Sequence, residues 1–255
     1  MPETTFFSSG TTGQIPSQHL VKSLDWYHYI STYGFEQQYG SLKDYCILGL
    51  LPSYLERPGA SLVSMVDAFI KASKYEESGF FLDQFSDLYQ SLLMCREKGI
   101  PTILWGVSFA LLDFMEAYSI AFPELIIMET GGMKGRRKEM TRQELHQTLK
   151  QAFQVAHIHS EYGMTELLSQ AYAPKNGRFL PTSAMKIAIT DPTDPFTFLA
   201  VGKRGLINII DLANLDTISF IATQDIGCTY DDGSFEVLGR HDASEVRGCN
   251  LMIAY

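Results

Sequence analysis

The central part of the sequence alternates short apolar runs with longer segments whose apolar residues recur at helical spacing. The run CILGLL at 46–51 ends before Pro52, whereas the segment 61–72 places Leu62, Met65 and Phe69 on one helical face. Such alternation indicates crossover helices on a mostly parallel sheet. We therefore predict an α/β fold, with strands over 46–51, 101–106, 125–128 and 155–159 and helices over 61–72, 82–98, 109–120 and 141–153.

The last of these helices carries a start signal. Thr141 is followed three residues later by Glu144. This Thr-x-x-Glu pattern is typical of a capping box, in which each side chain bonds the backbone N–H of the other residue. We expect the helix to begin there.

The pattern changes after residue 182 to short apolar segments that Asp, Pro and Gly turns separate. No long amphipathic segment lies between them, which is typical of antiparallel strands. We predict strands over 185–190, 205–212, 217–223 and 234–238. The chain is thus expected to have an α/β part over 1–182 and a smaller, barrel-like β-rich part over 183–255.

Charge and cysteine usage exclude several classes of protein. With 20 Lys and Arg against 29 Asp and Glu, the net charge is −9, which argues against a nucleic-acid or membrane-surface binder. No apolar run reaches the ~18–20 residues that a membrane span requires. The four cysteines lack a C-x-x-C pair, which is typical of reduced cytoplasmic thiols. The sequence therefore predicts a cytoplasmic protein with no membrane span and no nucleic-acid partner.

Three motifs carry the chemical signal. The first is FSSGTTG at 7–13, whose glycines allow close backbone approach and whose hydroxyls can bind phosphate oxygens. The second is SEYGMTE at 160–166, which follows a predicted strand, where open α/β sheets bind ligands. The third is QDIG at 224–227, followed by GRHD at 239–242, which offers an acid for a ribose diol and an arginine for a phosphate.

In this order the motifs resemble those of the adenylate-forming superfamily, whose acyl and aryl ligases make acyl-AMP from ATP and a carboxylic acid. The resemblance runs from Phe7 to Met252. Within the superfamily the chain is similar to the acyl-protein synthetases of bacterial bioluminescence fatty-acid reductase complexes, through GGMKG at 131–135, His19 and RGCNLM at 247–252. The resemblance implies a truncated adenylate-forming N-terminal domain that ends near the hinge, with the C-terminal lid domain absent.

The resemblance assigns roles to residues that would bind the phosphates and the metal. Ser9, Thr11 and Thr12 would contact the β- and γ-phosphates of ATP, and Thr165 the α-phosphate. Glu166 would help to hold Mg²⁺. The cofactors implied are thus ATP and Mg²⁺.

Further roles concern the nucleoside and the acyl group. Tyr162 would stack on the adenine, Asp225 would bind the ribose hydroxyls, and Arg240 would bind the ribose or a phosphate. Gly131 and Gly132 would lie beside the adenine and the acyl channel. These five residues are therefore candidate nucleotide-binding residues.

Cys249 is the candidate acyl acceptor, because acyl-protein synthetases carry the acyl group on a cysteine near the C-terminus. We expect activation of a carboxylic acid, of the fatty-acid class, and its transfer to this thiol and on to a partner protein or reductase. Two alternatives stay open, a fragment of an acyl- or aryl-coenzyme A ligase and a non-catalytic nucleotide- or partner-binding subunit. The sequence leaves the oligomeric state open.

Overall fold

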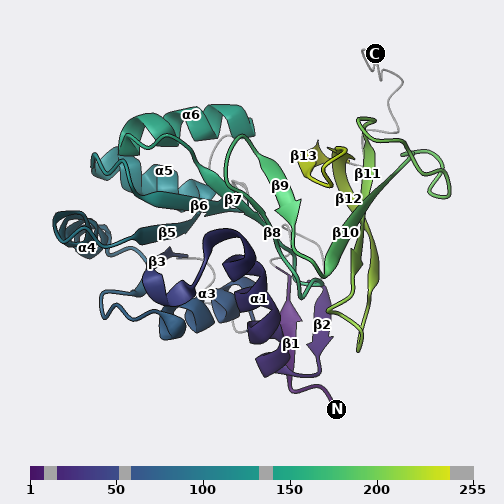
Figure 1. The fold of residues 1–255 in the computed structure, drawn as a ribbon, viewed down its shortest axis with the longest axis horizontal. Coiled ribbons are helices and arrows are strands. Elements are labelled where there is room, and N and C mark those ends of the chain that lie inside the picture. Colours follow the sequence, from purple (N-terminus) through teal and green to yellow (C-terminus); the bar gives the residue numbers. More distant parts are fainter. Residues whose placement is uncertain (9–15, 52–58, 132–139, 242–255) are drawn as a thin grey trace.

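The computed structural model of the chain describes residues 1–8, 16–51, 59–131 and 140–241. An α/β part with parallel strands is followed by an antiparallel β-rich part, as the two sequence patterns predict (Figure 1). In the described part of the chain, no helix combines the length and the apolar character that crossing a membrane demands.

Five parallel strands form the sheet of the α/β part, in the order β4-β3-β5-β6-β7. Their bounds are β3 Cys46–Leu50, β4 Gly79–Phe81, β5 Thr102–Val107, β6 Ile126–Thr130 and β7 His159–Tyr162. The chain passes from β3 to β4 on one side and then returns to add β5, β6 and β7 on the other. Open α/β sheets bind ligands outside the carboxyl ends of such strands, so a site is expected at this edge.

Within the described residues, five α-helices cover the two faces of this sheet. They are α1 Leu24–Tyr39, α3 Ser61–Ala72, α4 Phe85–Glu97, α5 Ser108–Ala117 and α6 Arg142–Phe153. Helices α1 and α3 lie on one face, and α4, α5 and α6 on the other (Figure 1). The predicted capping box is confirmed, because Thr141 caps α6 and both of its reciprocal bonds with Glu144 are present.

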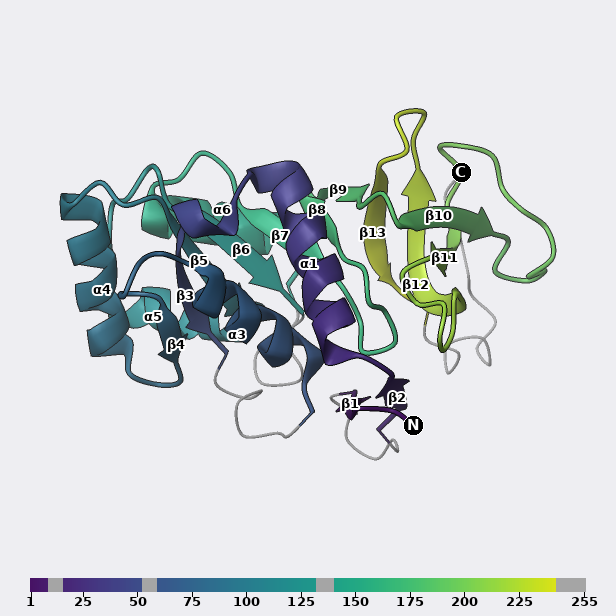
Figure 2. The same ribbon diagram turned by 60° about the horizontal axis from the view of Figure 1, so that its bottom comes forward.

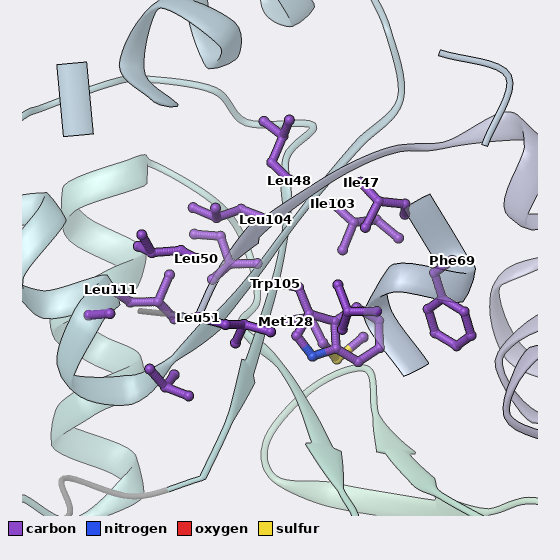
Figure 3. Packing of buried hydrophobic residues seen from close by; sticks show 14 of the residues in the cluster. Ile47, Leu48, Leu50, Leu51, Phe69, Ile103, Leu104, Trp105, Leu111 and Met128 are labelled. Atoms are coloured by element: carbon purple, nitrogen blue, oxygen red, sulfur yellow. The ribbon is translucent and has the colours of Figure 1, made fainter. Parts of the chain in front are cut away.

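The core of the α/β part explains why its central strand is apolar throughout. All six residues of β5 are buried, since helices cover both faces of a parallel sheet. Alternate residues point to opposite faces: Trp105 packs on Phe69 of α3, with ring centroids 5.6 Å apart, and Leu104 lies on the side of Leu111 of α5 (Figure 3). Burying each such side chain contributes about 1.5–3 kcal/mol.

The β-rich part continues the same sheet. Its strands are β8 Ala171–Ala173, β9 Arg178–Pro181, β10 Met185–Thr190, β11 Gly205–Asp211, β12 Phe220–Thr229 and β13 Phe235–Arg240. All pairs among them are antiparallel. Strand β8 joins the two parts because it also pairs with β7, and β9 lies between β8 and β13 (Figure 2). Phe179 and Phe235, opposite each other in this junction, stack at 5.4 Å.

Two predicted strand positions were wrong. The strand expected over 155–159 begins only at His159 and ends at Tyr162, so most of it lies where we predicted a loop. Its polar residues Ser160 and Glu161 are buried and bond to other side chains, which lets a polar segment serve as an internal strand. The strand expected over 217–223 runs from Phe220 to Thr229 and includes a register irregularity.

Three elements near the N-terminus were not predicted. They are β1 Thr4–Phe7, β2 Gln18–Val21 and helix α1. The inner face of α1 includes the small residues Ser31 and Gly34, while the large rings of Trp26 and Tyr29 are exposed. The apolar spacing of this helix is therefore too weak to indicate which face is buried.

Candidate functional site

The site is built at the carboxyl ends of β6 and β7. Gly131 follows β6 directly, with a φ of 72°, in the left-handed region that glycine adopts without strain. Its carbonyl accepts a 2.9 Å hydrogen bond from Ser108 Oγ, at the start of α5. The register pairs Thr130 with Glu161, so Gly131 and Tyr162 are the residues next in line on the two strands.

Tyr162, Asp225 and Arg240 come together although they are far apart in the sequence. The Tyr162 hydroxyl donates a 2.7 Å hydrogen bond to Asp225 Oδ2, and Asp225 lies opposite Arg240 in the β12–β13 pairing. The Tyr162 ring packs edge-on against Phe179 and Phe235, at 5.8 and 5.6 Å. Burial and the nearby Asp225 carboxylate raise the pKa of Tyr162, so the phenol stays protonated and donates.

Glu166 is attached through Ser17 to the flanks of the segment 9–15. Ser8 N–H donates to the carbonyl of Ser17 at 3.0 Å, and Ser17 N–H donates to Ser8 Oγ at 2.8 Å. The Ser17 hydroxyl in turn donates to Glu166 Oε1 at 2.5 Å. The flanks of the predicted phosphate loop are therefore closed on each other and attached to the predicted metal ligand.

The loop that contains Glu166 is anchored by residues that the sequence did not single out. The buried carboxylate of Asp211 accepts bonds from Leu168 N–H at 2.8 Å and from the hydroxyl of Ser169 at 2.6 Å. The amide of Asn214 donates to the carbonyl oxygen of Glu166 at 2.7 Å. An acid that ends the apolar run GLINIID is the signal that could have pointed to Asp211, because buried charges require partners.

A buried glutamate is linked to Gly131, the first residue of the GGMKG segment at 131–135. Glu129 of β6 accepts hydrogen bonds from Ser160 at 2.7 Å and Ser108 at 3.2 Å, and His146 Nε2 lies 3.3 Å away. Burial on its own raises the pKa of Glu129, but the hydrogen bond with His146 and the charge of Arg142 outweigh it, so the pKa is lowered. Ser108 bonds both Glu129 and Gly131 and so links this cluster to the loop.

Glu161 faces the opposite side of the sheet and behaves differently. Its Oε2 accepts a 2.5 Å bond from Thr130, and burial, with the charge of Glu129, raises its pKa to about 7. Its Oε1 lies so close to Gly163 that a Cβ there would be 2.4 Å away. A titratable carboxyl is thus packed directly beneath the Tyr-Gly turn.

A single carboxylate fits the magnesium that the motifs imply. The described residues contain no group of three His, Cys, Asp or Glu that could hold a metal. Mg²⁺ is, however, commonly bound by one or two carboxylates together with substrate phosphates and waters. Within the described part of the chain, Oε2 of Glu166 accepts no hydrogen bond, so this oxygen fits a metal held jointly with phosphates.

The remaining predicted residues divide into two groups. Thr165 lies half-buried in the turn before Glu166, and no bond of its hydroxyl is present among the described residues. Outside the described residues lie Ser9, Thr11, Thr12, Gly132 and Cys249. The other three cysteines, Cys46, Cys95 and Cys228, are free and buried.

Comparisons by sequence find nothing: no protein-family model matches the chain, and no curated protein sequence does. Solved structures with the same fold do exist. ATP-bound MatB from Rhodopseudomonas palustris superposes with a TM-score of 0.64 at 18% identity, covering 92% of this chain and 47% of MatB. O-succinylbenzoate coenzyme A synthetase (MenE) from Bacillus subtilis, in complex with AMP, gives 0.66 at 19% identity, covering 94% and 50%.

A luciferase-like enzyme from the mealworm Zophobas morio gives a TM-score of 0.60 at 19% identity, covering 94% of this chain and 57% of the enzyme. The chain thus spans about half the length of the structures that it matches. At these identities the likeness is one of fold alone: the chain shares the α/β architecture of about half of each of these enzymes.

Proposed function

We propose that this protein activates a carboxylic acid with ATP, giving acyl-AMP and pyrophosphate, and transfers the acyl group to a thiol. The observation that carries the proposal is the grouping of Tyr162, Asp225 and Arg240 beside the loop in which Glu166 bonds Ser17. Ser17 in turn bonds Ser8, at the other flank of the segment 9–15. Two structures with the same fold, of MatB and MenE, hold ATP and AMP, which supports a nucleotide as the ligand.

In this proposal the nucleoside binds at the carboxyl ends of β6 and β7, beside Asp225 of β12. Asp225 accepts hydrogen bonds from the ribose hydroxyls, and its orientation is set by the Tyr162 hydroxyl. Tyr162 and the glycines at 131 and 132 contact the adenine, because the glycines lack side chains that would keep it away. Arg240 offers a charged donor to the ribose or a phosphate.

The phosphates lie along the segment 9–15, where Ser9, Thr11 and Thr12 donate to the β- and γ-phosphate oxygens and Thr165 to the α-phosphate. Glu166 holds Mg²⁺, which when bound neutralises the negative charge that develops on the phosphates. A carboxylate oxygen of the substrate forms a bond to the α-phosphorus while the bond to pyrophosphate breaks. Positioned hydroxyl and guanidinium donors stabilise this transition state.

The second step uses Cys249 as the acceptor. Its thiolate attacks the acyl carbonyl, a thioester forms, and AMP leaves. Arg247, two residues away, favours the thiolate form. The other three cysteines are buried, which leaves them poorly placed to meet an acyl adenylate. The proposal extends to a fatty acid as the substrate, a cytoplasmic location and an acceptor protein or reductase that takes the acyl group from Cys249.

Intact-mass measurement tests both steps. The protein is incubated with ATP, Mg²⁺ and a panel of carboxylic acids, as wild type, as Cys249→Ala and as Cys228→Ala for a matched control. We expect an acyl adduct on the wild type and on Cys228→Ala, absent from Cys249→Ala and removed by hydroxylamine. The mass of the adduct identifies the acid.

Other outcomes separate the alternatives. Acid-dependent ATP–pyrophosphate exchange without an adduct overturns the role of Cys249 and retains activation. Product released only when coenzyme A is added supports a coenzyme A ligase. Nucleotide binding by calorimetry with no exchange for any acid overturns the enzymatic proposal and supports a binding subunit.

A further inference from the structure

We propose that Asn214 and Thr217 are positioning residues for Glu166, linking it to His19 through a chain of hydrogen bonds. This inference rests on the proposed function, because it assumes that Glu166 holds Mg²⁺. It adds residues that lie outside all three sequence motifs, in the loop after β11.

The chain of bonds starts at the main chain of Glu166. Asn214 Nδ2 donates to the Glu166 carbonyl oxygen at 2.7 Å, and Asn214 Oδ1 accepts a short bond from the Thr217 hydroxyl. Because the one hydroxyl proton of Thr217 goes to Asn214, its oxygen is left to accept from His19 Nε2, 3.2 Å away. Asn214 and His19 are buried whereas Thr217 is exposed, so burial shields the Asn214–Glu166 bond from water more than it shields the two bonds of Thr217.

The Thr217 hydroxyl decides which end of the Asn214 amide faces Glu166. An amide presents an oxygen and an NH₂ group of nearly equal size, and the partners determine its orientation. With Thr217 donating to Oδ1, only the NH₂ group is directed at the Glu166 carbonyl. Without that hydroxyl, the amide can turn its oxygen toward the carbonyl, where two acceptors repel each other.

A second contact, from the residue before strand β2, holds the side chain of Glu166. Ser17 directly precedes β2, which contains His19, and donates to Glu166 Oε1. The segment Ser17–His19 therefore holds the carboxylate of Glu166 through Ser17. It holds the main chain of Glu166 through His19, Thr217 and Asn214. Partners of this kind around a metal ligand commonly change metal affinity 10–100-fold when they are removed.

Titration calorimetry of ATP at a series of Mg²⁺ concentrations tests the inference. For Asn214→Ala and Thr217→Val we expect the Mg²⁺ concentration that gives half of the full enhancement of ATP binding to rise about tenfold. Metal-free ATP affinity should stay at the wild-type value, which a general loss of structure would not allow. Thr217→Ser restores the hydroxyl and should return the Mg²⁺ dependence to that of the wild type.

Asn208→Ala is the matched control, because Asn208 lies on the preceding strand β11 and bonds Thr190 and Leu206 but, among the described residues, has no bond to Glu166. Glu166→Gln separates this inference from the proposed function. If Glu166→Gln leaves the Mg²⁺ dependence unchanged, the metal role of Glu166 is wrong and the inference is overturned with it. If Glu166→Gln raises the Mg²⁺ concentration needed for half of the enhancement but folded Thr217→Val does not, the inference alone is overturned. Should Asn214→Ala not fold, the comparison of Thr217→Val with Thr217→Ser still tests the inference.

Discussion

The hydroxyl of Tyr162 and the carboxylate of Asp225 lie 2.7 Å apart although 63 positions separate them in the sequence. Tyr162 ends the last parallel strand, and Asp225 lies within β12 of the antiparallel part. This bond therefore ties the two parts of the chain together at the candidate nucleotide site. A change to either residue should affect ligand binding more than folding.

Replacing Tyr162 with Phe should weaken AMP and ATP binding about tenfold. A hydrogen bond to a charged group contributes about 1.5–3 kcal/mol, and its loss leaves Asp225 free to adopt orientations that do not match the ribose. Calorimetric titration checks the affinity. Tyr45→Phe is the matched control, because it removes another 2.7 Å hydrogen bond of a tyrosine hydroxyl, to the Tyr39 carbonyl, in the α/β part. Equal losses of affinity in the two variants would contradict the prediction.

Replacing Glu129 with Gln should lower the free energy of unfolding by about 1–3 kcal/mol. Glu129 is buried, and His146, Ser160 and Ser108 surround its carboxylate. A neutral amide weakens these bonds and leaves one buried group facing a donor. Urea denaturation measures the effect, with the exposed Glu124→Gln as the control. Similar stabilities of the two variants would show that the buried cluster contributes little.

The fold could be predicted where periodicity is strong. The helix over Ser61–Ala72 and the strand over Met185–Thr190 have the predicted bounds. Helix α1 was missed because its exposed rings and small buried residues blur the apolar face. Strand β7 was displaced because Ser160 and Glu161 are polar, and only their tertiary partners make them suitable for an interior. The boundary after residue 182 stays a prediction.

The candidate site could be predicted in part. Motif order indicated Tyr162, Asp225, Arg240 and Glu166 as candidates, and the strand pairings bring the first three together. Asp211 belongs to no motif, although an acid at the end of an apolar run is a local signal for it. Asn214 could not be found from the sequence, because its role depends on a loop that returns to Glu166 across the 48 positions between them. Local spacing carries no information about such a contact.

Stability should fall with rising pH because of Glu161. Burial raises its pKa to about 7, against about 4.3 in an unfolded chain. Between these values the folded state binds more protons than the unfolded state, so the free energy of unfolding decreases as pH rises through this window. Glu161→Gln removes the titration. The free energy of unfolding of the variant, relative to that of wild type, should therefore rise by about 2 kcal/mol from pH 5 to pH 8.

Chemical denaturation at several pH values measures this gain, and Glu129→Gln supplies a weaker case. The pKa of Glu129 is itself lowered, but its charge helps to raise the pKa of Glu161. The difference between Glu129→Gln and wild type should therefore increase from pH 5 to pH 8 by less than the difference for Glu161→Gln. A flat difference for Glu161→Gln would show that Glu161 titrates normally.

The close packing of Gly163 on Glu161 predicts a specific coupling between the two residues. A Cβ at Gly163 would lie 2.4 Å from Glu161 Oε1, and the bond from Thr130 limits how far that carboxylate can move. Gly163→Ala should therefore lower the free energy of unfolding by about 1–3 kcal/mol. In a Glu161→Ala background the clash is absent, so the same change should cost about 0.5 kcal/mol or less, giving a clear coupling in a double-mutant cycle. Gly79→Ala, where a Cβ meets nothing within 4 Å, is the control for replacing a glycine without a clash. Equal costs of Gly163→Ala in both backgrounds would place the steric conflict elsewhere than at Glu161.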